Sequence, residues 1–142
     1  MIVAKTFKWE AAHRIPWHNG KCKHLHGHSY KMIVEFEGEP DENGFVIDFN
    51  IIKEIITPYI KAIDHTTIIS SKDTELKEVF DTKKWKYYLL PFDSTAENLC
   101  KHFADLIIAE QQTLLKENKI TALSIKVFET ETSYTYLSVQ LS

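Results

Sequence analysis

Two stretches of the chain, residues 2–14 and 26–37, place apolar side chains at every second position along much of their length. A period of two predicts β-strands that each bury one face. The segment between them, residues 15–25, contains proline, asparagine and glycine and is typical of a loop. We therefore expect two neighbouring antiparallel strands joined by this loop.

Histidines gather at the joined ends of these predicted strands, where five of the seven in the chain fall between His13 and His28. His26 and His28 are two residues apart and so point the same way, while His13 ends the apolar face of the first strand. Three imidazoles around one ion, with no fourth protein ligand, are typical of a catalytic zinc site. His18 and His24 are alternative ligands, and ordinary surface histidines are the alternative interpretation.

Two further groups could take part in chemistry near such a site. Cys22 lies four residues before His26, and it could be a fourth zinc ligand, a catalytic thiol or neither. Asp64 directly precedes His65, and an aspartate can orient an imidazole for proton transfer. Adjacent side chains meet only if the chain bends there, so an ordinary polar helix end is the alternative for this pair.

Glu129 extends a stripe of apolar residues that includes Leu123, Ile125 and Val127. This placement directs its carboxylate toward a buried region, where it needs hydrogen-bond partners. A planar ligand edge with two N–H donors would supply a bidentate pair. The alternative is that the strand has already reached solvent at this point.

Two helices are expected in the middle of the chain. Asp48 is a good N-cap for a helix that runs to about Ile63, with Pro58 predicting a kink or a break. Residues 94–97 fit a capping box with serine first and glutamate three positions later, and the helix behind it should run to about Lys116. Residues 66–92 show no clear pattern and leave room for a short helix.

The last part of the chain, residues 120–130 and 133–141, is predicted to form two strands joined by a tight turn. The order β-β-α-α-β-β predicts a single α+β domain over residues 1–142, with an antiparallel sheet and helices on one face. Such a sheet has open edges, and pairing between subunits is one way to close them.

Composition and charge exclude several classes of partner and location. The net charge of −3 and the pI of about 6.2 argue against nucleic acid as the main partner. No apolar run reaches the ~18 residues of a membrane span, and the N-terminus lacks the pattern of a secretory signal. Two cysteines make no disulfide framework. We therefore expect a cytoplasmic protein.

Taken together, these segments resemble the 6-pyruvoyl-tetrahydropterin synthase / 6-carboxy-tetrahydropterin synthase family over nearly the whole chain. The resemblance is carried by residues 7–14, 22–28, 47–49, 64–65, 94–98 and 128–130. It implies the tunnelling fold (T-fold), in which β-β-α-α-β-β units assemble into a ring-shaped barrel, often a homo-hexamer made of two trimers with active sites between subunits.

The resemblance also implies roles for individual residues. His13, His26 and His28 match the zinc ligands, and Cys22 matches the catalytic thiol. Asp64 and His65 match the partners that assist proton transfer. Glu129 matches the carboxylate that anchors the pterin ring. Thr95 and Glu97 match a segment near the pterin.

The spacing Cys-x-x-x-His-Gly-His resembles the bacterial 6-carboxy-tetrahydropterin synthases of queuosine (7-deazaguanine) biosynthesis. The implied reaction is the zinc-dependent conversion of 7,8-dihydroneopterin triphosphate to 6-carboxy-tetrahydropterin, acetaldehyde and triphosphate. The alternatives are a 6-pyruvoyl-tetrahydropterin synthase, which only eliminates triphosphate, and a non-catalytic zinc module in which Cys22 closes the coordination sphere. A zinc hydrolase acting on another substrate is a more distant alternative.

Overall fold

The computed structural model describes residues 1–142, and its centre is a long antiparallel pair of strands. β1 (Ile2–His13) pairs with β2 (His26–Glu37) over twelve positions, from Ile2 opposite Glu37 to His13 opposite His26. Burial alternates along both strands as the period of two predicts. The connecting loop contains one short 3-10 turn, η1 (Lys21–Lys23).

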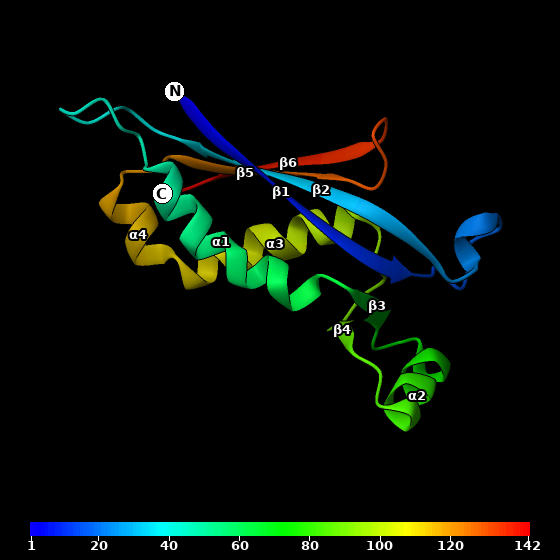
Figure 1. Ribbon diagram of the computed structural model, residues 1–142. Helices are drawn as coiled ribbons and strands as arrows, with labels where there is room; N and C mark the ends of the chain where they lie inside the picture. Colours follow the sequence, from blue (N-terminus) through cyan, green and yellow to red (C-terminus); the bar gives the residue numbers. More distant parts are fainter.

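The C-terminal strands extend this pair on the side of β2. β5 (Ala122–Phe128) pairs antiparallel with β2, and β6 (Tyr134–Gln140) pairs antiparallel with β5. The turn between β5 and β6 lies at the same end of the sheet as the loop between β1 and β2 (Figure 1).

The prediction of a purely antiparallel, four-stranded sheet is wrong, because residues 66–92 add two strands. This segment forms β3 (Thr66–Ser70), α2 (Thr74–Lys83) and β4 (Tyr87–Leu90). β3 runs parallel to β1 and to β4, giving a mixed sheet in the order β4-β3-β1-β2-β5-β6. Every residue of β3 is buried, so the strand has no alternation by which a period of two could reveal it.

The first predicted helix is confirmed as α1 (Phe49–Ile63), capped by the Asp48 carboxylate, which accepts from the Asn50 N–H at 2.8 Å. The predicted break at Pro58 is absent, because the helix continues through this residue to Ile63. Pro58 is exposed, so its ring meets solvent and not the sheet.

The second predicted helix needs two corrections. Its N-cap is Thr95 and not Ser94, because the Thr95 hydroxyl accepts the Asn98 N–H at 3.1 Å. It also divides in two at Gln111, into α3 (Ala96–Glu110) and α4 (Gln112–Glu117). The shift of the cap by one residue leaves the Ser94 side chain free for another contact.

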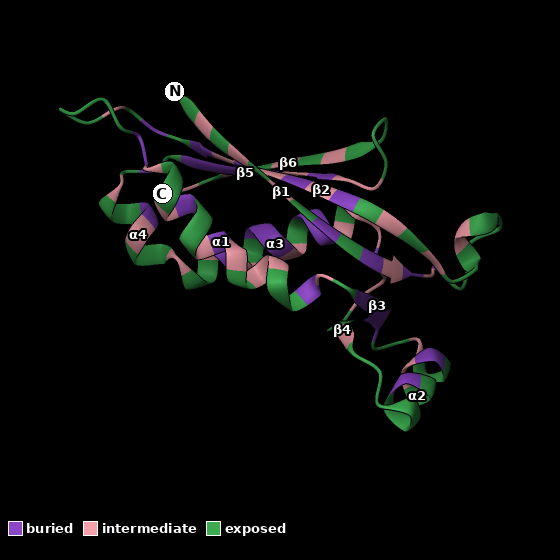
Figure 2. Cartoon of the chain, viewed as in Figure 1, coloured by how far each residue is buried: buried purple, intermediate pink, exposed green.

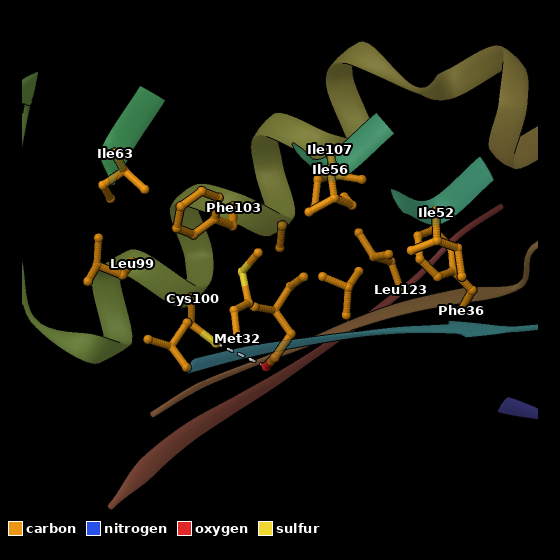
Figure 3. Packing of buried hydrophobic residues seen from close by; sticks show 14 of the residues in the cluster. Met32, Phe36, Ile52, Ile56, Ile63, Leu99, Cys100, Phe103, Ile107 and Leu123 are labelled. Carbon is orange, nitrogen blue, oxygen red and sulfur yellow. Dashed lines mark hydrogen bonds between the residues drawn. The ribbon is translucent and has the colours of Figure 1, made fainter. Parts of the chain in front are cut away.

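α1 and α3 cover one face of the sheet, as predicted (Figures 1 and 2). The other face is covered by a helix only at β3, where Ile69 packs against Leu76 and Phe80 of α2. The core between the layers contains fully buried side chains from both helices and from the sheet, among them Ile52, Ile56, Phe103, Met32 and Phe36 (Figure 3). None of the helices combines the length and apolar character needed to cross a membrane.

Candidate active site

The pairing of β1 with β2 brings the three predicted zinc ligands together. His13 lies opposite His26, and His28 lies two residues further along the same face of β2. The ligand atoms of the three residues all lie within 4.8 Å of one another, and the ring centroids are 4.7–5.1 Å apart. His18 and His24 do not belong to this group.

Main-chain carbonyls fix the tautomers of two of these imidazoles. His13 Nδ1 lies 3.0 Å from the Ser94 carbonyl oxygen, and His26 Nδ1 lies 2.6 Å from the carbonyl oxygen of His24. A carbonyl only accepts, so each Nδ1 carries the proton and each Nε2 keeps its lone pair. This is the arrangement by which proteins orient metal-binding histidines.

The donor set fits a metal ion. His13 Nε2 is buried and has no hydrogen-bond partner within the chain, which leaves a polar atom unsatisfied unless something else binds it. The Nε2 atoms of His26 and His28 lie 3.1 Å apart. Two nitrogens bound to one tetrahedral zinc ion lie about 3.3 Å apart, so the observed spacing needs little adjustment.

Burial keeps the imidazoles of His13 and His28 in the form that binds metal. Desolvation is the main reason why the pKa of His13 is lowered to about 4. The hydrogen bond to the Ser94 main chain raises this pKa, while the neighbouring His26 and His28 lower it further. Burial, followed by the charge of His26, also lowers the pKa of His28. Both rings are therefore neutral near pH 7, and neutral imidazole is the ligand form.

A pocket of about 380 Å³ opens beside the three histidines, and we call it the Cys22 pocket. Five of the nine predicted site residues line it: His13, Cys22, Thr95, Glu97 and Glu129. Cys22 lies on η1 and is half-buried. Its sulfur is not part of the close group of metal-binding atoms. The pocket therefore combines the Cys22 thiol and the carboxylates of Glu97 and Glu129 with one imidazole of the group, that of His13, within one concave surface.

Glu129 follows the last residue of β5, and its carboxylate is half-buried, with Oε2 3.8 Å from His28 Nε2. Desolvation and the nearby Glu97 raise its pKa, while His26 lowers it. The carboxylate is thus held in an environment that favours pairing with hydrogen-bond donors.

Asp64 and His65 form the predicted pair, but they lie outside the Cys22 pocket. His65 has φ 59°, which bends the chain after α1 and brings its Nδ1 to 3.0 Å from Asp64 Oδ1. The Glu10 N–H donates to Asp64 Oδ1 at 2.8 Å and, with His65, lowers the pKa of Asp64. The His65 side chain is 77% exposed and lines a separate hollow with Glu10 and Ser29.

Three residues around the site were not expected from the sequence. Ser94, interpreted as a helix cap, is instead buried, and its hydroxyl lies 3.0 Å from His13 Nδ1. Trp17 and Tyr134 are exposed aromatic side chains that line the Cys22 pocket. Nothing in the local pattern marks Ser94, whereas an aromatic residue in a polar loop is a visible signal.

Residues 2–139 match the family described as 6-pyruvoyl tetrahydropterin synthase. The chain belongs to this family. It is 32% identical over 129 residues to the 6-carboxy-5,6,7,8-tetrahydropterin synthase of Rickettsia bellii, covering 89% of this chain and 91% of that protein. It is 29% identical to the Haemophilus influenzae protein of the same name, covering 93% and 94%. The chain is therefore an enzyme of the tetrahydropterin synthase type, which places it among the lyases.

Solved structures agree on the fold. The crystal structure of 6-pyruvoyl tetrahydropterin synthase from Plasmodium vivax has a TM-score of 0.80 at 20% identity, covering 99% of each chain. A Wolinella succinogenes protein of uncharacterized function has a TM-score of 0.78 at 21% identity, covering 96% of this chain and 97% of that one. The expected T-fold is confirmed by these similarities, and the arrangement of the elements is α+β.

The contact between Ser94 and His13 generates a prediction about metal affinity. Ser94→Ala removes the hydroxyl that lies beside His13 Nδ1 but keeps the carbonyl that accepts from it, so we expect metal binding to weaken by about 10-fold, the low end for losing a supporting partner. Competition with a chromophoric chelator for Zn²⁺ measures the change. Ser138→Ala is the matched control, since its hydroxyl bonds Ser124 in the sheet. Equal Zn²⁺ affinity in both variants would show that the Ser94 hydroxyl does not support His13 and that the Ser94 carbonyl orients the imidazole alone.

Proposed function

We propose that the protein is a zinc-dependent lyase that converts 7,8-dihydroneopterin triphosphate and water to 6-carboxy-5,6,7,8-tetrahydropterin, acetaldehyde and triphosphate, as in queuosine biosynthesis. The observation that carries the proposal is the close group of three imidazoles beside a pocket that His13 lines together with the Cys22 thiol and the half-buried Glu129 carboxylate. Relatives at about 30% identity that carry the 6-carboxy-tetrahydropterin synthase name support the choice of reaction.

His13, His26 and His28 would hold the metal through their Nε2 atoms and leave at least one position open for substrate. A zinc ion bound there supplies Lewis acidity, which polarises substrate oxygens and makes neighbouring C–H bonds more acidic. The carbonyls of Ser94 and His24 keep the ligand lone pairs directed at this point.

Glu129 would bind the edge of the pterin ring that carries two N–H donors. A half-buried carboxylate pairs well with such an edge, because two parallel hydrogen bonds fix both distance and orientation. Thr95 and Glu97, at the start of α3, line the same pocket beside it. Binding the ring here places the substrate side chain toward the three histidines, which lowers the entropic part of the barrier.

Cys22 would accept a proton from the substrate side chain as a thiolate, and the Asp64–His65 pair would relay or return protons. Cys22 lines one pocket and His65 lines another, so within one chain the two groups do not face the same space. We therefore propose that a complete site uses Cys22 of one subunit and His65 of a neighbouring one.

A homo-oligomer, most simply a hexamer built as a dimer of trimers, would supply this arrangement. β4 and β6 are the edges of the sheet, and each has backbone groups available for pairing with another copy. A free catalytic thiol is best preserved in the reducing cytosol, so we place the protein there, acting on a small pterin substrate and not on nucleic acid.

The 6-pyruvoyl-tetrahydropterin synthase reaction is the second candidate, because the family and its solved structures carry that name. It would use the same metal, thiol and ring anchor, and it would differ in keeping the side-chain carbons on the product. A non-catalytic zinc module requires Cys22 as a ligand, and the absence of its sulfur from the close ligand group speaks against this alternative.

Product analysis tests the proposal. Zinc-loaded protein incubated with 7,8-dihydroneopterin triphosphate should release acetaldehyde and 6-carboxy-tetrahydropterin, identified by mass spectrometry. Cys22→Ala and His65→Ala should each lower turnover by about two to four orders of magnitude, the range for losing an acid–base group, with zinc content unchanged. 6-Pyruvoyl-tetrahydropterin as the sole product would select the second candidate. No consumption of substrate would contradict both.

Mixing inactive subunits tests the shared site. When Cys22→Ala and His65→Ala chains are dissociated together and reassembled at random, about one site in four receives an intact Cys22 and an intact His65 from different chains. We expect about a quarter of the activity of wild-type protein treated in the same way. Each variant reassembled alone is the control. A mixture as inactive as the two controls would show that both residues act within one chain.

A further inference from the structure

Trp17 is exposed but held in a fixed position. The residue is 66% exposed and lies in the loop between β1 and β2. A turn orients this part of the loop, because the His18 N–H donates to the Ile15 carbonyl at 3.0 Å and Pro16 occupies the second position. Ile15 is buried at only 6% exposure and anchors the turn to the body of the protein.

A hydrogen bond fixes the indole ring itself. Trp17 Nε1–H donates to Asp93 Oδ2 at 2.8 Å, and Asn98 Nδ2 donates to the Asp93 carbonyl at 2.9 Å. Asp93 is followed by Ser94, whose hydroxyl contacts His13, and then by Thr95, which caps α3. One short segment therefore sets the position of the indole relative to the histidines.

The indole belongs to the wall of the Cys22 pocket, which also includes Glu129. The two residues reach the pocket from different segments, the β1–β2 loop and the β5–β6 turn, at the same end of the sheet (Figure 1). A carboxylate that binds a ring by its edge leaves both faces of the ring to be covered by something else. A rigid aromatic side chain covers such a face at small conformational cost.

We propose that Trp17 determines specificity by stacking on one face of the bicyclic pterin ring whose edge Glu129 binds, and that Asp93 is the positioning residue for the indole. This inference rests on the proposed function, since it takes the pterin as the occupant of the pocket. It adds a role in ring recognition for a residue that neither the metal nor proton transfer requires.

Neopterin, which carries the ring without the triphosphate, is the probe, and calorimetry of the zinc-loaded protein is the measurement. Trp17→Ala should weaken neopterin binding by about 5- to 150-fold, the effect of losing one base–aromatic stack. Trp17→Phe keeps an aromatic face and should retain most of the affinity. With the triphosphate substrate, Trp17→Ala should raise KM while kcat changes little, because stacking is equal in ground and transition states.

Two substitutions of Asp93 test its role in positioning the indole. Asp93→Ala frees the indole and should weaken neopterin binding less than Trp17→Ala does, while Asp93→Asn keeps an acceptor oxygen and should restore binding. Zinc content should stay constant throughout, which separates ring recognition from damage to the metal site.

Trp85→Ala is the matched control, because Trp85 is 54% exposed and packs on Phe80 beside α2, away from the Cys22 pocket. Its neopterin affinity should equal that of the wild type. Unchanged affinity in Trp17→Ala, or equal losses in Trp17→Phe and Trp17→Ala, would overturn the stacking role and leave the proposed reaction standing. A wild-type protein that neither binds neopterin nor consumes the substrate would overturn both.

Discussion

The antiparallel register of β1 and β2 is the constraint on which the site depends. It places His13 opposite His26 and, by the alternation of side chains along each strand, puts both with His28 at the end of the face that carries the buried core residues. Because side chains alternate across a strand, a slip of one residue would turn one strand's histidines to the opposite face and expose its core residues. Burial of the Met32, Phe36 and Trp9 side chains therefore fixes the register of the two strands, and with it the positions of the histidines as well as the stability of the fold.

The segment that precedes α3, residues 93–95, links the paired strands β1 and β2 to the Cys22 pocket. Asp93 binds the Trp17 indole, Ser94 binds the Nδ1 side of His13, and Thr95 caps the helix that packs on the sheet. Three consecutive residues thus orient the Trp17 indole, the His13 imidazole and the start of α3. On the other side of β1, the main chain of Glu10 holds Asp64 and His65, so the same strand supports residues of two separate pockets.

The sequence predicted the site best where residues with reactive or metal-binding side chains lie on strands with a clear period of two. The period of two predicted the histidines on one face, and the structure places them there. The apolar stripe before Glu129 predicted a carboxylate directed toward a buried region, and the structure shows it half-buried. β3 was not predictable by alternation because it is buried on both faces, and the cap shifted from Ser94 to Thr95 because both residues are good caps. The separation of His65 from Cys22 depends on tertiary packing, which no local pattern encodes.

The central claim is that the three histidines form a metal site with an open position and that Cys22 stays free to react. X-ray absorption spectroscopy at the zinc K-edge of the loaded protein measures this directly. The account predicts about three imidazole nitrogens at roughly 2.0–2.1 Å, with any remaining ligand a light atom from solvent. A sulfur at about 2.3 Å, lost in Cys22→Ala, would show that Cys22 closes the coordination sphere and would contradict the catalytic account.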